Sequence, residues 1–168
     1  MIETAYIDAC FFKNFAAGDG LAIFDQLFPD GASTGIIAYR ELCVFHADVL
    51  PGRLNVKDSD SSMLLTAIGE IQFRHRALST ADAELFYLAE TNGGTIYTDE
   101  QPLYKVCQAR NVSCRRFIGY LHEAVNTGVL SPVDAIAFLQ RVLVIKPPRR
   151  FPPDLITQTM EAWQRLKS

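Results

Sequence analysis

Four acidic residues of this chain lie beside apolar segments in a pattern that suits binding of a divalent metal ion. Hard cations such as Mg²⁺ and Mn²⁺ take oxygen ligands from a few carboxylates and leave room for water and phosphate. In parallel sheets, the ligand crevice forms at the carboxyl ends of the strands. Acids gathered there could hold a metal that acts on phosphate. The four residues are Asp8, Glu41, Asp82 and Asp99.

Two of these acids follow short apolar runs that we expect to be buried strands. Asp8 closes the run AYID, and Asp99 follows the run TIYT. Glu41 and Asp82 fall on expected helices beside apolar residues, so we expect their carboxylates near the boundary of the core. Unpaired charges at such places are costly, and a bound cation would relieve that cost.

Each acid also has an ordinary structural interpretation. Asp8 and Asp99 stand between a strand and a helix, where Asp often caps the helix N-terminus. Asp82 is the last residue of STAD, a capping-box pattern that begins at Ser79. Glu41 suits a solvated helix face. Taken singly, the acids favour these structural roles; taken together, their order favours a metal site.

The elements that must position these acids alternate between strand and helix along the chain. Such alternation predicts an α/β fold, a three-layer α/β/α sandwich with a mainly parallel central sheet. We expect one domain over 1–168, with a core at 1–130 and a helical extension at 131–168. Strands are expected at 4–8, 32–36, 53–56, 95–98 and 111–114, and helices at 9–17, 21–28, 38–45, 61–76, 79–90, 103–110, 117–126, 131–145 and 153–166.

Composition excludes several classes of protein. The chain has 168 residues, of which 49% are hydrophobic and 21% charged, as in ordinary globular domains. Polar residues interrupt every apolar run, and the first residues lack the basic start of a signal peptide, so we expect a cytoplasmic protein that does not enter the membrane. No P-loop, dinucleotide-binding or GxSxG motif occurs. The four cysteines form no CxxC pair and three of them fall within apolar patterns, so we expect buried free thiols and no zinc site.

Charge is distributed unevenly along the chain. Residues 1–100 carry 6 Lys or Arg against 15 Asp or Glu, whereas residues 101–168 carry 10 against 4. This asymmetry suits either a metal site with a phosphate-contacting rim or two solvated faces without a partner. Two basic clusters, Arg115-Arg116 and residues 146–150, could contact an RNA backbone or simply be solvated.

In order and spacing, these segments resemble the PIN-domain family, close to the toxin ribonucleases of bacterial toxin–antitoxin pairs. The opening strand with Asp8 resembles the first acidic motif of the family, and AYREL, with Glu41, its second. LSTADAELFYLAETNGGTIYTDE resembles the most recognisable stretch, with Asp82 on a helix and Thr98-Asp99 after the next strand. PLYKVCQARNVSC resembles the helix and strand that follow. The resemblance covers roughly residues 4–120 and is strongest over 78–114.

The resemblance implies a Mg²⁺- or Mn²⁺-dependent ribonuclease that hydrolyses RNA phosphodiester bonds. Asp8, Asp82 and Asp99 would then ligate the metal. Glu41 would complete the acidic ring directly or through a water, and Thr98 would position a water or a ligand. An RNA substrate, an antitoxin protein as partner and a homodimer follow from the same resemblance.

The chain departs from the family pattern in two places. Glu84 and Glu100 add acids beside the expected ones, so they are additional candidates for the metal site. Residues 131–168 add two helices that the minimal pattern does not require. These departures also suit a PIN-like module that binds RNA or a protein without cleaving. A receiver-type phosphoacceptor domain would need a pair of acids at the end of the first strand, where only Asp8 stands.

Overall fold

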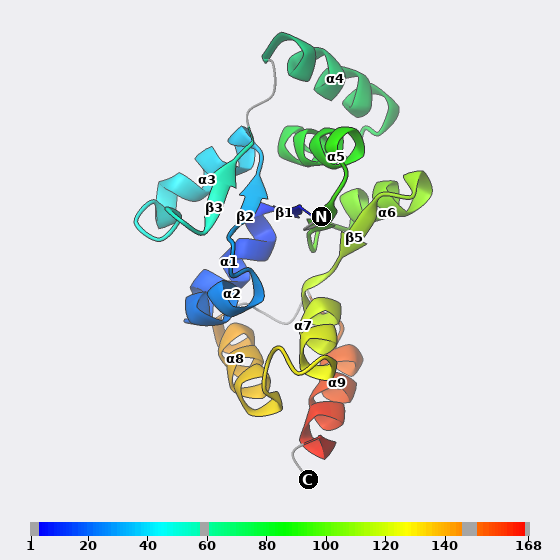
Figure 1. Ribbon diagram of the computed structural model, residues 1–168. Helices are drawn as coiled ribbons and strands as arrows, with labels where there is room; N and C mark the ends of the chain where they lie inside the picture. The colour runs from blue at the N-terminus through cyan, green and yellow to red at the C-terminus, as the bar shows by residue number, and fades with distance from the viewer. Residues whose placement is uncertain (1–3, 58–60, 146–150, 167–168) are drawn as a thin grey trace. The chain divides into compact units, whose positions relative to one another are not determined.

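The computed structural model describes residues 4–57, 61–145 and 151–166 and shows an α/β protein built on a five-stranded sheet (Figure 1). Neighbouring strands are all parallel, in the order β3-β2-β1-β4-β5. Of the strands that pair with neighbours on both sides, β1 and β4 are largely apolar, as expected of parallel strands covered on both faces, whereas β2 reads Ala-Ser-Thr and is buried all the same. The strands are β1 (Ala5–Ile7), β2 (Ala32–Thr34), β3 (Leu54–Val56), β4 (Thr95–Tyr97) and β5 (Ser113–Arg115).

Each helix expected from the sequence is present, with ends that differ by one or two residues. The α/β class and the parallel sheet are therefore confirmed, and the alternation of elements is compatible with a three-layer sandwich. Every helix in the described part of the chain is too short or too polar to cross a bilayer. The helices are α1 (Ala9–Ala17), α2 (Leu21–Leu27), α3 (Ile36–His46), α4 (Ser61–Arg74), α5 (Thr80–Asn92), α6 (Gln101–Arg110), α7 (Phe117–Asn126), α8 (Pro132–Ile145) and α9 (Pro153–Arg165).

Internal contacts divide the chain into two compact units. The first contains Met1–Phe12 and Asp30–Arg116, and the second contains Lys13–Pro29 and Phe117–Ser168. The first unit therefore holds the whole sheet with α3 to α6, and the second holds α2 and α7 to α9. This division falls after Arg116, whereas the sequence suggested a boundary at residue 131. The single domain over 1–168 stays a prediction.

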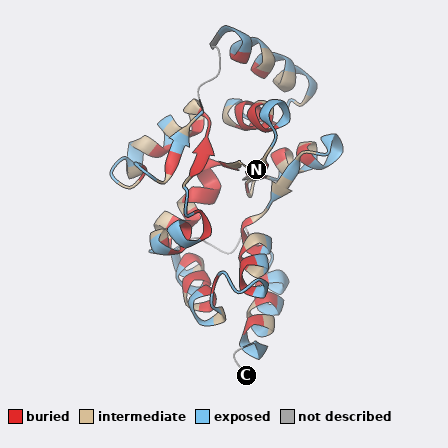
Figure 2. Cartoon of the chain, in the orientation of Figure 1, coloured by how far each residue is buried: buried red, intermediate tan, exposed pale blue. Residues whose placement is uncertain are grey.

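Helix α5 is the central helix of the first unit. It packs against β1 and β4 of the sheet and against the helices α3, α4 and α6. Figure 2 shows the buried colour along most of this helix. Leu85 and Phe86 join Tyr6 and Ile96 in one apolar cluster. A helix enclosed in this way tolerates polar side chains only where they find partners, and that condition applies to the two acids of α5 described below.

The second unit is held by an aromatic cluster around Phe15. Its ring centroid lies 5.3 Å from those of Phe24 and Phe138 and 5.4 Å from that of Phe117. The loop after α1 must pass close to this cluster. A Cβ atom on Gly20 would lie 2.2 Å from the ring of Phe138, which is fully buried. The loop therefore requires a residue without a side chain at this point.

Gly20→Ala should lower the free energy of unfolding by about 1–3 kcal/mol, because the buried Phe138 ring would have to move. Gly119→Ala is the matched control: Gly119 lies within α7 with nothing within 4 Å of a Cβ atom, so alanine should be neutral or stabilising by up to about 1 kcal/mol. Urea unfolding followed by the fluorescence of Trp163, the single tryptophan, measures both. Equal costs for the two variants would contradict the close approach.

Candidate functional site

Asp8 and Thr98 lie side by side at the carboxyl end of the central strands. Ile7 of β1 is in register with Tyr97 of β4. The ladder continues for one more residue, since the Asp8 backbone N–H donates to the Tyr97 carbonyl at 3.0 Å. The first residue beyond each strand therefore meets its neighbour across the sheet edge, as predicted for acids that follow parallel strands.

The Asp8 carboxylate is buried and held through one of its two oxygens. The Thr98 hydroxyl donates to Oδ2 at 2.7 Å, and the Cys10 thiol donates to the same oxygen at 2.8 Å. The carboxylate is 5% exposed. Among the described residues, no backbone N–H donates to it, and Oδ1 accepts no hydrogen bond. The helix-capping interpretation of the Asp8 side chain is therefore not what the structure shows.

The pKa of Asp8 is raised to about 6, chiefly by burial and in smaller part by the negative charges of Asp82 and Glu100. The hydrogen bonds from Cys10 and Thr98 oppose this rise but do not cancel it. Burial beside Asp8 also raises the pKa of the Cys10 thiol, which keeps it a hydrogen-bond donor. The negative charges of Asp82 and Glu100 thus act on the Asp8 carboxylate at the end of the sheet.

Asp82 has the capping role considered for it, and its role as a metal ligand stays a prediction. Its Oδ2 accepts from the Ser79 backbone N–H at 2.9 Å and from the Ser79 hydroxyl at 2.8 Å, which completes the capping box of α5. The side chain is buried, and its charge reaches Asp8. In the described part of the chain, its second oxygen has no hydrogen-bond partner. Asp8 and Asp82 are therefore alike: each is fixed through one oxygen and leaves the other available.

Glu84, an additional candidate for the metal site, caps a helix in the structure. Its two carboxylate oxygens accept from the backbone N–H groups of Ile36 at 3.0 Å and Ile37 at 2.9 Å. These are the first N–H groups of α3, so Glu84 caps a helix far away in the sequence. The side chain is fully buried, and burial raises its pKa although both N–H groups and Arg40 oppose the rise.

The cap by Glu84 depends on Gly35, the residue before α3. A Cβ atom on Gly35 would lie 2.2 Å from Oε2 of Glu84. Only glycine leaves space for the carboxylate to reach the two N–H groups. The sequence contained this signal as a glycine between a strand and a helix, but the partner on α5 lies 48 residues beyond Ile36.

The acids after β4 divide between the site and its surroundings. The Glu100 charge contributes to the raised pKa of Asp8, while the charge of Asp99 acts on Cys10. Both carboxylates are half-buried. Thr98 uses its hydroxyl to donate to Asp8 and to accept from the Glu100 backbone N–H at 3.0 Å. It therefore orients Asp8, and the role in positioning a water or a ligand stays a prediction.

Glu41 lies on α3, and its side chain is exposed. The charges of Asp82 and Glu100 thus act on Asp8, the charge of Asp99 acts on Cys10, and Glu41 lies on the helix that Glu84 caps. Within the described residues, no three His, Cys, Asp or Glu side chains form a ready-made group for a metal ion. The basic cluster at 146–150 lies outside the described residues, and all four cysteines are free thiols, of which two are buried.

The donor chemistry of this cluster fits a hard divalent cation. Mg²⁺ and Mn²⁺ take carboxylate oxygens. In both Asp8 and Asp82, hydrogen bonds to one carboxylate oxygen fix the side chain, and the second oxygen is left for a cation. A cation would also offset the mutual repulsion that raises the pKa of Asp8. We therefore take Asp8, Asp82 and Glu100 as the residues that would hold such an ion.

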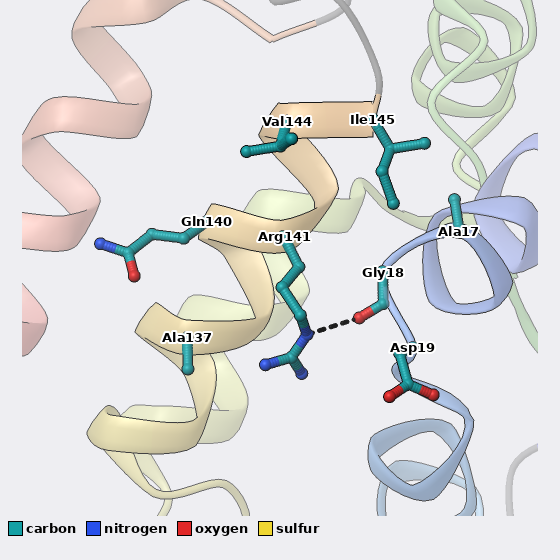
Figure 3. Close-up of a pocket in the computed structure, with 8 residues that line it drawn as sticks. All are labelled: Ala17, Gly18, Asp19, Ala137, Gln140, Arg141, Val144 and Ile145. Atoms are coloured by element: carbon teal, nitrogen blue, oxygen red, sulfur yellow. Dashed lines mark hydrogen bonds between the residues drawn. The ribbon is translucent and has the colours of Figure 1, made fainter.

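A cavity of about 480 Å³ lies in the second unit and shares none of these residues. It is lined largely by apolar side chains of α8 and by the loop after α1, with Arg141 directed at the loop (Figure 3). The Arg141 Nε donates to the Gly18 carbonyl at 2.8 Å, which ties the loop to α8. Its lining carries no group of acids comparable to the one at the sheet edge.

Comparison of the chain with models of protein families, with curated proteins and with solved structures finds no match in any of the three. The chemistry of the site therefore rests on the residues themselves.

The stability of the metal-free protein should depend on pH through Asp8. A pKa raised from 3.8 to about 6 means that the folded protein binds this proton more tightly than the unfolded chain. The stabilisation is therefore complete below pH 4 and is lost as pH rises through 6. Asp8→Asn removes this dependence, so its stability relative to wild type should improve by about 2.4 kcal/mol between pH 4 and pH 7.5. Urea unfolding of both proteins at the two pH values tests this; a constant difference would contradict it.

The cap of α3 by Glu84 can be tested with two substitutions. Gly35→Ala should lower the free energy of unfolding by about 2–3 kcal/mol, because the new Cβ atom displaces the buried carboxylate from its N–H partners. In a Glu84→Ala background the same substitution should have little further effect, since the side chain it collides with is gone. Thermal or urea unfolding of the four proteins gives the coupling. Additive effects would show that the two residues do not interact as described.

Proposed function

We propose that this chain is a Mg²⁺- or Mn²⁺-dependent endoribonuclease of PIN type. The observation that carries the proposal is the buried Asp8 carboxylate, which caps no helix among the described residues and lies within the field of two further acids. Folding alone does not account for a charge held in this way, and perturbed acids in such positions are typical of functional sites. Asp8 directly follows the carboxyl end of a parallel strand, and this position supports the finer assignment to a PIN-like three-layer fold.

In this proposal each side chain has a defined task. Asp8 and Asp82 offer one oriented oxygen each, Glu100 adds a third carboxylate, and Asp99 extends the acidic ring. Thr98 and Cys10 hold Asp8 through its Oδ2, so its Oδ1 would be available to the ion. A divalent cation bound there would polarise the phosphodiester and lower the pKa of the attacking water. Glu41 stays a candidate for the outer part of the ring, through a water.

The toxin branch of the family adds further expectations. An RNA-cleaving toxin acts in the cytoplasm, is held inactive by an antitoxin protein and often forms a homodimer. The acidic centre and the parallel sheet support the nuclease part of this reading; the toxin part rests on the motif resemblance over residues 78–114. A small reading frame for a DNA-binding protein beside the gene would support it.

Asp8→Asn should abolish Mn²⁺-dependent cleavage of a single-stranded RNA and reduce Mn²⁺ affinity at least tenfold, because the oriented Oδ1 is lost. Asp154→Asn is the matched control: this acid is exposed on α9, and its removal should change neither property. Gel assays of RNA cleavage and calorimetric titration with Mn²⁺ measure the two effects, and circular dichroism checks the fold. Full cleavage by Asp8→Asn would overturn the proposed site.

The same assays decide which acid after β4 takes part. Glu100→Gln should reduce Mn²⁺ affinity more than Asp99→Asn, because the Glu100 charge acts on Asp8. A larger loss of Mn²⁺ affinity in Asp99→Asn would make Asp99 the metal ligand in place of Glu100, as the sequence suggested. Absence of Mn²⁺ binding by a folded wild-type protein at millimolar metal would favour the alternative, a PIN-like module that binds RNA or a protein without cleaving.

A further inference from the structure

The first residues beyond the five strands form a row along the carboxyl edge of the sheet. Backbone hydrogen bonds extend the ladder into this row: Lys57 N–H donates to Thr34, Asp8 N–H to Tyr97 and Thr98 N–H to Arg115, each at 3.0 Å. The row therefore has a cation at each end and the Asp8 carboxylate at its centre. In order across the sheet it reads Lys57, Gly35, Asp8, Thr98 and Arg116.

Arg116 is held in this row by neutral groups. Its Nη1 donates to Oε1 of Gln101 at 2.9 Å, and its Nη2 to the Asp99 carbonyl at 3.4 Å. The guanidinium carbon lies 5.6 Å from the centroid of the Tyr104 ring. Gln101 and Tyr104 belong to the first turns of α6, so this helix fixes the position of the cation beside the acidic cluster.

The charge of Arg116 has no acidic partner in the described part of the chain. A guanidinium carries five N–H donors, and the two hydrogen bonds above use only two of them. Arg110, at the other end of α6, forms a salt bridge with Glu90 at 2.7 Å. Near the same helix, Arg110 is thus neutralised by a carboxylate, whereas Arg116 is held in place by neutral groups and keeps N–H donors that are not used.

Such a guanidinium suits the phosphate of a neighbouring nucleotide. Its planar fork matches the oxygens of a phosphate group, and prior ordering by stacking reduces the entropy lost on binding. Neighbouring strands are about 4.8 Å apart, so the backbone of Arg116 lies about 10 Å from that of Asp8. In a stacked strand of RNA, neighbouring nucleotides are about 3.4 Å apart, so this distance spans about three nucleotides. An extended strand would span it with fewer nucleotides.

Resting on the proposed function, we propose that Arg116 binds a phosphate of single-stranded RNA that flanks the phosphate cleaved at Asp8. The RNA backbone then crosses the sheet edge from β1 toward β5. Arg116 therefore increases the affinity for RNA that extends past the cleaved phosphate and takes no part in the reaction itself. A substrate with a single phosphate gains nothing from this residue.

RNA binding without cleavage provides the first test. In an Asp8→Asn background, Arg116→Gln should weaken binding of a fluorescent single-stranded RNA octamer about tenfold. It should also reduce the slope of log affinity against log salt by about 0.7, the value for one phosphate contact with a single strand. Arg110→Gln changes net charge equally and should alter neither quantity, while Arg116→Lys should restore the salt slope. Equal effects of Arg116→Gln and Arg110→Gln would overturn the proposal.

Cleavage of a short and a long substrate provides the second test. Arg116→Gln should lower kcat/KM about tenfold for the octamer through KM and leave cleavage of a dinucleotide with one phosphate unchanged. Equal losses on both substrates would place Arg116 at the reacting phosphate or in folding, and so would overturn the flanking site. If wild type with Mn²⁺ cleaves neither substrate, the proposed function fails, while the binding test still decides whether Arg116 contacts RNA.

Discussion

The arrangement of the first unit depends on burying the carboxylate of Asp8 at the end of β1. A charge that is 5% exposed requires hydrogen-bond donors, and the two that reach it come from different elements. Thr98 follows β4, and Cys10 lies in the first turn of α1. The parallel register of β1 and β4 is therefore what brings the Thr98 hydroxyl to the carboxylate. A shift of one residue along either strand would turn these side chains to opposite faces of the sheet.

Helix α5 extends this constraint to the rest of the unit. Asp82 caps the start of α5 itself, and Glu84, two residues later, caps the start of α3. Asp82 accepts from Ser79, the cap residue of the same helix, whereas Glu84 accepts from N–H groups of α3, so rotation or sliding of α5 would leave those two donors without their acceptor. The helix that carries Asp82 is thereby fixed relative to α3. Gly35 completes this framework because it leaves the space that the Glu84 carboxylate occupies.

Periodicity and turn residues were sufficient to predict the helices and strands. Apolar runs bounded by Gly, Pro and Asn predicted strands such as TIY, and the STAD pattern predicted the start of α5 with its capping box. Parallel pairing predicted that the residues after the two strands lie together, but it named Asp8 and Asp99, whereas the structure places Thr98 beside Asp8. The role of Glu84 could not be predicted, because its partners at Ile36 and Ile37 are distant in sequence and no local pattern marks them. A pattern also cannot distinguish which of two adjacent acids, Asp99 or Glu100, acts on Asp8. The grouping of residues 13–29 with the C-terminal helices likewise depends on long-range contacts between aromatic rings.

The structure separates the acids of this chain by what folding requires of them. Glu84 is fully explained by the helix it caps, and Asp82 is explained in part, since one oxygen completes a capping box. Asp8 has no such explanation, because its burial raises its own pKa and no described backbone N–H offsets this. The same reasoning applies to the cations at the edge of α6: Glu90 accounts for Arg110, and no carboxylate of the described chain accounts for Arg116. Glu84 is bound by backbone N–H groups and Arg110 by a carboxylate of the fold itself. Asp8 and Arg116 are held by neutral groups only, so their charges are available to a bound ligand. An anion bridged to a cation at Asp8 and extending to Arg116 would satisfy both, and a polyanion with regularly spaced phosphates has that form.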